Sequence, residues 1–353
     1  MTEEPIPQRI EEILLGGKRR YTRGQVAEKS GVAAERAREL WHSLGFAAVP
    51  DDAKVFTDSD VEALRTANEL VQAGITDPAQ ATSTARMLGQ HVSRLAESQV
   101  EMLRAILVAN PELAADERQL TRFVERIVPD LEHLQTFAWR RHLAAFAGRA
   151  LVASDQDVAT HHQVVGFADM VGFTSFTRRS SEAELVSVVD RFDAVTAEVV
   201  AENHGRIVKM IGDEVLFVAD NPPQGAEIAL TLLERAEKDD QLPLLRAGLA
   251  CGRVLSRFGD IYGSVVNLAS RLTSVARPGT VLIDREMADA LAGHLEFVIH
   301  QRRPIAVRGY ARLRASVLRR AEDAELPHIP LEPDHDHARP HRTRDSRSTR
   351  RRL

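Results

Sequence analysis

Cysteine is nearly absent from this chain of 353 residues, and long apolar runs are absent altogether. The one cysteine, Cys251, excludes an intrachain disulfide framework and fits a reducing compartment. No run of about 18 uncharged apolar residues occurs, and residues 1–9 lack the apolar stretch of a signal peptide. We therefore expect no transmembrane segment and a cytoplasmic location, with peripheral association at a membrane left open.

Excess positive charge is also lacking. The formal net charge is −5, which gives no general attraction to nucleic acid, so we do not expect nucleic acid as a partner. Hydrophobic residues make up 44% of the chain, enough for a sizeable core, and the length allows two domains and a tail. Residues 1–155 read as almost wholly helical, and residues 156–320 mix strand and helix patterns. Residues 321–353 form an Arg-rich segment typical of a disordered tail.

The most informative segment places an acid, an amide and a guanidinium where a loop meets a helix. Asn267 and Arg271 are four residues apart, so they share one face of the helix predicted over about 264–275. Asp260 stands in the turn before that helix, after a strand predicted over about 245–256. A solvated helix face is the plain alternative for these residues.

An upstream carboxylate stands at the end of a short apolar strand predicted over about 163–169. This is Asp169, and Gly172, Phe173 and Thr174 follow it on the way to a helix predicted over 182–203. A carboxylate in this place suits a hard cation, and backbone N–H groups of the following turn suit phosphate oxygens. A surface acid or a helix cap is the alternative interpretation.

A second carboxylate, Asp213, follows Gly212 at the tip of a hairpin predicted over 206–219. It is placed to join Asp169 as a metal ligand. Lys209 alternates with apolar neighbours on the first strand of that hairpin. Taken alone, a hairpin Asp is usually a turn residue, and a strand Lys is usually solvated.

Together these segments resemble class III nucleotidyl cyclases, specifically adenylyl cyclases, over about residues 158–320. The resemblance implies an α+β catalytic domain with a ferredoxin-like core, and Mg²⁺ or Mn²⁺ as cofactor, two ions per site. The implied site residues are the metal-binding Asp169 and Asp213, the adenine-reading Lys209 and Asp260, and the ribose-orienting and transition-state-stabilising Asn267 and Arg271. It also places Gly172, Phe173 and Thr174 at the phosphates, and Arg308 as a further cationic contact to the triphosphate. An exposed Arg before a glycine turn is the plain alternative for Arg308.

The chemistry of the implied reaction accounts for these residue types. The 3′-hydroxyl of ATP attacks its own α-phosphate, giving 3′,5′-cyclic AMP and pyrophosphate. Metal ions lower the pKa of the hydroxyl and neutralise developing charge, and two carboxylates suffice because Mg²⁺ also takes water and substrate oxygens. In the family each site draws residues from two subunits. Since this chain carries both sets, we expect a homodimer with two equivalent sites.

The rest of the catalytic half should complete the sheet. Helix 223–238 follows the hairpin, and short strands are predicted at Thr280–Ile283, Phe297–Gln301 and Arg314–Leu318. We expect an antiparallel-rich sheet with helices on one face.

The helical half begins with residues 21–41, which look like the helix-turn-helix of MerR-type regulators, with Gly31 between the helices. Long amphipathic helices are predicted at about 61–73, 78–107, 117–128 and 130–152. We interpret residues 1–155 as an all-α regulatory domain, because the resemblance extends to bacterial cyclases whose helical N-terminal modules restrain the catalytic dimer.

The segment 131–153 is the expected linker helix, with apolar contacts from Phe137, Trp139, Leu143 and Phe146. Four histidines lie near this junction, at positions 133, 142, 161 and 162. Histidine titrates near neutral pH, so a proton is one effector hypothesis and a lipid in the helical domain is another. Four ordinary surface histidines are the plain alternative.

Other functions stay open at this level. A DNA-binding transcriptional regulator with a cyclase-like sensor domain would leave the six cyclase positions unexplained. A diguanylate cyclase shares Gly-Asp-Glu at a hairpin but does not require Asp260, Asn267 and Arg271 at these spacings. A guanylate cyclase would need base-reading residues other than Lys209 and Asp260, because guanine offers different donors and acceptors.

Overall fold

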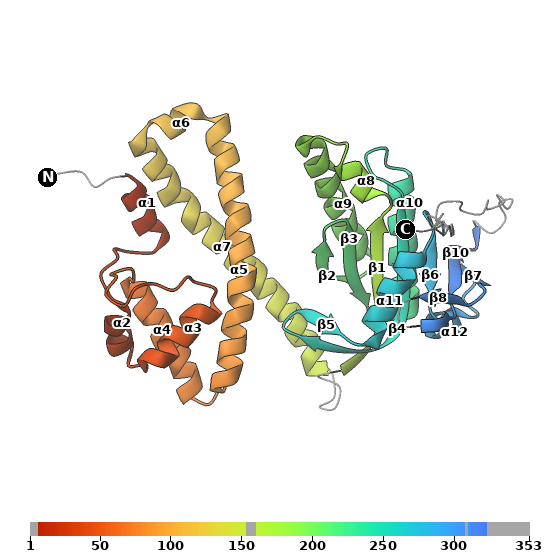
Figure 1. Cartoon of the computed structure of the whole chain (residues 1–353), viewed down its shortest axis with the longest axis horizontal. Coiled ribbons are helices and arrows are strands. Elements are labelled where there is room, and N and C mark those ends of the chain that lie inside the picture. Colours follow the sequence, from red (N-terminus) through yellow and green to blue (C-terminus); the bar gives the residue numbers. More distant parts are fainter. Residues whose placement is uncertain (1–5, 153–159, 308–309, 323–353) are drawn as a thin grey trace, which may run out of the picture. The chain divides into compact units, whose positions relative to one another are not determined.

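The computed structural model describes residues 6–152, 160–307 and 310–322. Its elements divide between two compact units (Figure 1). One comprises residues 1–160 with the short segment 256–260, and the other comprises residues 161–255 and 261–353. Among the described residues, no helix is long and apolar enough to cross a membrane. The tail expected from residue 321 lies outside the described residues from 323 onward.

The first unit is built from helices. The predicted pair about Gly31 is present, since this glycine ends α2 in the left-handed conformation with φ 70°. A capping box starts α2, in which Thr22 and Gln25 exchange side-chain and backbone hydrogen bonds. The helices are α1 (Ile6–Leu14), α2 (Arg23–Ser30), α3 (Ala34–Ser43), α4 (Asp58–Gln72), α5 (Pro78–Ala109), α6 (Pro111–Ala115) and α7 (Glu117–Val152).

Helix α7 is continuous where the sequence predicts two helices, 117–128 and 130–152. Pro129 lies inside it and lacks the N–H that would bond to the carbonyl four residues earlier. One missing hydrogen bond bends a helix but need not end it when both flanking segments are long and helix-forming. The predicted break was therefore wrong.

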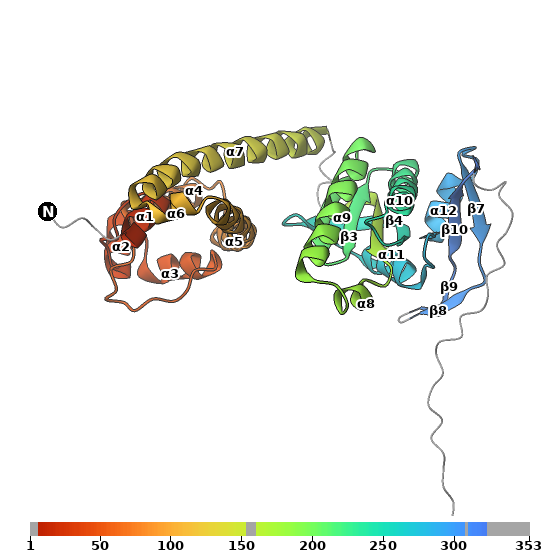
Figure 2. The ribbon, with the colours of Figure 1, turned by 90° about the horizontal axis from the view of Figure 1, so that it is seen from above.

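A sheet of eight strands forms the centre of the second unit (Figure 2). The order along it is β2-β3-β1-β4-β6-β10-β7, and β5 pairs with β4. Strand β1 runs antiparallel to β3, whereas β4 and β6 are parallel. The strands are β1 (Thr160–Met170), β2 (Arg206–Ile211), β3 (Glu214–Ala219), β4 (Leu245–Arg257), β5 (Asp260–Tyr262), β6 (Val281–Ile283), β7 (Phe297–Gln301) and β10 (Ser316–Arg320).

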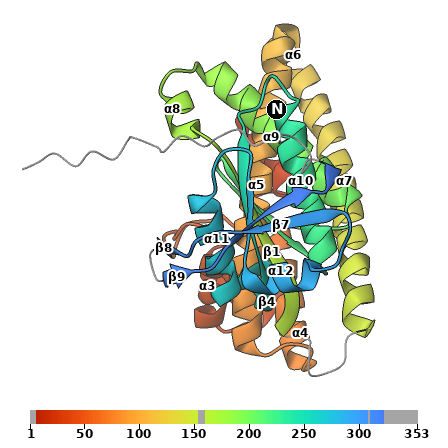
Figure 3. The same ribbon diagram turned by 90° about the vertical axis from the view of Figure 1, so that its right-hand side faces the viewer.

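Helices cover both faces of this sheet, which corrects the expectation of helices on one face. Side chains from α9 (Glu182–Glu202), α10 (Pro222–Glu237) and α12 (Arg285–Leu291) join one core cluster, and α11 (Ser264–Val275) joins the other (Figure 3). Alternate residues of β3 enter the two clusters, so Phe217 packs on one face and Leu216 on the other. The signal was present in the unbroken apolar run of β3, because a strand buried on both faces does not alternate.

Close approach of α11 to the sheet depends on Gly248 in β4. A Cβ atom at this position would come within 2.3 Å of the Thr273 backbone nitrogen and 2.6 Å of the Ala269 carbonyl oxygen. Only glycine leaves room for that contact. The sequence of β4 therefore fixes how near α11 lies.

Several short elements were not predicted. They are α6, α8 (Phe173–Thr177), α12, β5, β8 (Ile305–Val307) and β9 (Tyr310–Leu313), and β8 and β9 form a separate two-stranded sheet. Asp260, which the sequence placed in a turn, is the first residue of β5. The strand predicted at 314–318 is displaced to Ser316–Arg320. Such elements are too short to show a period in the sequence.

Candidate active site

Two carboxylates meet at one end of the sheet. Asp169 is the penultimate residue of β1 and lies opposite Glu214, the first residue of β3. Asp213 occupies the two-residue turn of the β2–β3 hairpin together with Gly212, whose φ is 67°. The N–H of Met170 donates to the Asp213 carbonyl at 3.0 Å and ties the turn to the end of β1. The hairpin that the sequence predicts is therefore present, and it brings the two predicted metal ligands side by side.

The electrostatics of this corner are dominated by burial and by mutual repulsion of acids. Burial raises the pKa of Asp169, hydrogen bonding to Arg246 opposes that rise, and the charge of Asp213 adds to it. Burial, with the charges of Asp169 and Asp213, raises the pKa of Glu214 to about 7. A cluster of acids that resists ionisation is a place where added positive charge is favourable.

Arg246 supplies positive charge here and was missed by the sequence reasoning. From the second position of β4, its Nε donates to Asp169 Oδ2 at 2.7 Å, and Nη2 lies 2.6 Å from the same oxygen. Nη1 donates to the Ser274 carbonyl in the last turn of α11 at 3.4 Å. The only sequence signal was a basic residue before the apolar and small residues 247–252 of the strand, and its partner is 77 positions away.

The segment after Asp169 turns into a short helix. Gly172 is left-handed, with φ 75°, and precedes α8, in which Phe173 stands first. Phe173 and Phe176 stack at a centroid distance of 6.1 Å and pack against the core, whereas Thr174 is exposed. The aromatic residues thus anchor a turn that leaves the threonine accessible.

The predicted base-reading residues stand on two different strands. Lys209 is exposed on β2, an edge strand, directly after an irregularity in the pairing of β2 with β3. Asp260 is half-buried at the first position of β5. Lys209 shares its hairpin with Asp213, so one supersecondary unit carries a predicted metal ligand and a predicted base contact.

Asn267 and Arg271 lie on the side of α11 that faces away from the sheet. Val265, Ala269 and Leu272 are buried against the sheet, while Asn267 is exposed and Arg271 is half-buried. The amide and the guanidinium share a face, as their spacing predicts. Arg308, predicted as a further phosphate contact, lies outside the described residues.

The two aspartates fit Mg²⁺ or Mn²⁺ in the chemistry of their donor atoms. Both offer hard carboxylate oxygens, and the Met170 N–H bonded to the Asp213 carbonyl holds the two residues at the same end of the sheet. Among the described residues no group of three or more His, Cys, Asp or Glu side chains could enclose a metal ion. A two-carboxylate site suits an ion that keeps waters and takes substrate oxygens as its remaining ligands.

Comparison with known proteins matches both halves of the chain. Residues 157–319 match the adenylate and guanylate cyclase catalytic domain, and residues 8–137 match the adenylate cyclase regulatory domain. An adenylate cyclase of Streptomyces coelicolor is 44% identical over 82% of this chain and 76% of its own length. One of Glutamicibacter nicotianae is 39% identical over 90% of this chain and 83% of its own length. A pH-sensitive adenylate cyclase of Mycobacterium tuberculosis is 34% identical over 76% of this chain and 69% of its own length.

The fold and these matches define a nucleotidyl cyclase with an attached helical region. Identity at this level over most of the chain goes further, and the chain belongs to the class III adenylate cyclases of actinobacterial type. Enzymes of this family depend in general on divalent metal ions.

Proposed function

We propose that the enzyme converts ATP to 3′,5′-cyclic AMP and pyrophosphate by two-metal catalysis. The observation that carries the proposal is the meeting of Asp169 and Asp213 at one end of the sheet. These carboxylates would hold the ions, which supply charge neutralisation and an acidified 3′-hydroxyl when bound. The half-buried environment strengthens the attraction of the carboxylates for a cation.

The remaining residues bind and orient the nucleotide in this proposal. Lys209 and Asp260 complement the N1 acceptor and N6 donor of adenine. Asn267 holds the ribose so that O3′ lies in line with the α-phosphate, and Arg271 stabilises negative charge in the transition state. Gly172, Phe173 and Thr174 provide the turn at the phosphates, and Arg308 is a further triphosphate contact.

The test is product identification with full-length protein, using ATP or GTP with Mg²⁺ or Mn²⁺. Asp169→Ala and Asp213→Ala should each lower the cyclase rate by at least about a hundredfold while leaving the oligomeric state unchanged. A variant that keeps near-normal activity would refute the metal assignment. Equal or greater activity on GTP would favour the guanylate cyclase alternative.

A homodimer with composite sites is part of the proposal. The linker residues Phe137, Trp139, Leu143 and Phe146, which the sequence analysis expected to make apolar contacts, are 59, 61, 51 and 47% exposed in the single chain. Large apolar side chains grouped on one helix are typical of a protein contact. A second copy is the occupant that a two-fold site requires. A protein that sediments as a monomer in sedimentation velocity and still has full cyclase activity would contradict this assignment.

Residues 1–155, with the linker helix from 131 to 153, act as a regulatory domain in this proposal, and residues 156–320 as the catalytic domain. The match to a regulatory domain over 8–137 supports this division. Helix α3 gives little support to the DNA-binding alternative, because it is held against α5 by hydrogen bonds from Arg36 to Thr82 Oγ1 and the Pro78 carbonyl.

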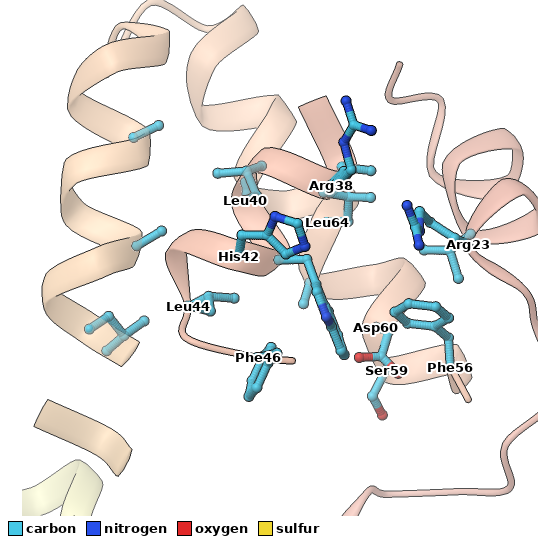
Figure 4. A pocket seen from close by; sticks show the side chains of 18 of the residues that line it. Arg23, Arg38, Leu40, His42, Leu44, Phe46, Phe56, Ser59, Asp60 and Leu64 are labelled. Atoms are coloured by element: carbon cyan, nitrogen blue, oxygen red, sulfur yellow. The ribbon is translucent and has the colours of Figure 1, made fainter. Parts of the chain in front are cut away.

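A lipid or a proton is the proposed effector. A cavity of about 670 Å³ lies within the helical unit, and Leu40, Leu64 and Phe56 are among its largely apolar lining (Figure 4). Arg38 and His42 also line it, which suits a ligand with an apolar body and an anionic end. Cyclase rate against pH, with and without fatty acid, should differ between the full chain and residues 155–353. Superimposable rate-against-pH curves for the full chain and for residues 155–353 would show that the helical domain does not regulate catalysis.

The junction histidines are the proposed proton sites. On α7, His133 and His142 are exposed. His162, on β1, lies 3.6 Å from Cys251 Sγ through Nδ1 and 3.6 Å from Glu286 Oε2 through Nε2. The side chain of His161 lies outside the described residues.

A further inference from the structure

Arg246 stands beside two acids, Asp169 and Glu214, at the corner of the sheet where the proposed metal ligands lie. Two of its nitrogens contact one oxygen of Asp169, and the side chains of both residues are partly shielded, at 31 and 14% exposure. Its charge also acts on Glu214, which lies opposite Asp169 in the β1–β3 pairing. Two carboxylates, Asp169 and Glu214, therefore share one guanidinium.

We propose that Arg246 is a positioning residue that occupies Asp169 as an internal counter-cation and so weakens metal binding until nucleotide is present. The inference deepens the proposed function and rests on its metal assignment. In this proposal Arg246 does not touch the substrate and acts only through its contact with Asp169.

The geometry makes the contact competitive with a metal ion. Both Nε and Nη2 converge on Oδ2, so this oxygen is already used by a charge-assisted hydrogen-bonding pair. A divalent cation on Asp169 would have to take that oxygen from the guanidinium or lie within a few ångströms of it. Two cations so close repel each other in a half-buried site.

If Arg246 moves away from Asp169, another acceptor is close enough to keep it. Its third nitrogen, Nη1, donates to the Ser274 carbonyl at 3.4 Å, in the last turn of α11. Carbonyls at a helix C-terminus have no partner within the helix and carry partial negative charge. The guanidinium can therefore leave the carboxylate without losing every polar partner, which is what an exchangeable contact requires.

The consequence is a metal site whose affinity depends on the substrate. Without nucleotide, the ion gains two carboxylates but displaces or opposes Arg246. With nucleotide, the phosphates bring several further negative charges and offset that repulsion. Arg246 thereby favours joint binding of metal and nucleotide over binding of metal alone.

Direct metal binding to the full-length, chelator-treated protein tests this without any turnover. Free Mn²⁺ is measured by electron paramagnetic resonance in the absence of nucleotide. We expect Arg246→Gln to bind Mn²⁺ about tenfold or more tightly than the wild type, because a guanidinium beside a carboxylate lowers that carboxylate's affinity even for a proton by about one to three powers of ten. Arg319→Gln, which removes an exposed arginine from β10 of the same sheet, should leave the affinity unchanged.

Unchanged or weaker Mn²⁺ binding by Arg246→Gln overturns the proposal, as a purely structural role would give a lower thermal stability and no gain in affinity. If that variant does not fold, Arg246→Lys decides. A single ammonium cannot match both contacts on Oδ2, so about threefold tighter binding supports the proposal, and wild-type affinity or weaker overturns it. Asp169→Asn distinguishes failure of this proposal from failure of the proposed function. If this variant binds Mn²⁺ as the wild type does, the assignment of Asp169 as a metal ligand is refuted.

Discussion

Asp284 is the one acidic or basic residue that is buried in the part of the chain that the structure describes, with 5% of its surface exposed. It caps α12, since its Oδ1 accepts the Met287 N–H at 2.9 Å. Burial raises the pKa of its carboxyl to about 6, and the backbone donors only partly oppose that rise. Because the folded chain holds the proton to a higher pH than the unfolded chain, Asp284 stabilises the fold below about pH 4. This contribution is lost as the pH rises through about 6.

Asp284→Asn keeps the cap acceptor and removes the buried charge. We expect the free energy of unfolding to exceed that of the wild type by about 1–3 kcal/mol at pH 7.5 and to differ little at pH 4. Urea unfolding at both pH values measures this difference. Asp289→Asn, on the exposed face of the same helix, serves as the control and should follow the wild type. A constant difference between Asp284→Asn and wild type at the two pH values would contradict the raised pKa.

At this scale motif spacing, which is local, led to the prediction of Asp169 and Asp213 as metal ligands, and the structure places both residues at one end of the sheet. It did not identify Arg246, whose partner comes from a strand far away in the chain. An ion pair between distant strands, such as Arg246 with Asp169, depends on the order of the strands in the sheet, and no short window of residues encodes that order.

At the scale of elements, α11 presents Asn267 and Arg271 only because its other face lies close to β4. Gly248→Ala would place a methyl group 2.3 Å from the backbone of Thr273, where a flexible side chain cannot simply move away. We expect a loss of about 1–3 kcal/mol in the free energy of unfolding and a lower cyclase rate, as α11 is forced outward. Denaturant unfolding and cyclase assays measure the two effects.

Gly252→Ala is the matched control on the same strand. A Cβ there would make only ordinary contacts, the nearest at 3.5 Å to Val265, so both stability and rate should stay near wild type. Equal losses in the two variants would show that strand β4 merely disfavours alanine, independent of α11.

Elements that a local turn motif or a regular residue spacing specifies were predictable from the sequence, and features that depend on packing were harder to predict. The hairpin about Gly212 and the helix of Asn267 follow from turn chemistry and spacing. The continuity of α7 through Pro129 depends on the turns on either side, which outweigh a local rule. The second covered face of the sheet left a signal in the apolar run of β3, but which helix covers that face depends on tertiary packing.

At the scale of the whole molecule, the proposed composite sites predict how dimers of two different variants behave. Asp169→Ala and Arg271→Ala homodimers should each be nearly inactive. A mixed dimer should contain one site with both lesions and one intact site, so activity should recover to at most about half of wild type. Co-purification with two affinity tags establishes the mixed dimer before its rate is measured. Absence of recovery in that dimer would show that each chain builds its own complete site.

Helix α7 has mechanical consequences that follow from its 36 residues alone. At the usual rise it is about 54 Å long, and about 35 Å separate Pro129 from Val152. A bend of about 10° at the proline would carry the last turn through about 6 Å, roughly one helical pitch. A small rotation at Pro129, no larger than thermal bending, would therefore displace the C-terminal end of α7 by a distance comparable to the length of a side chain.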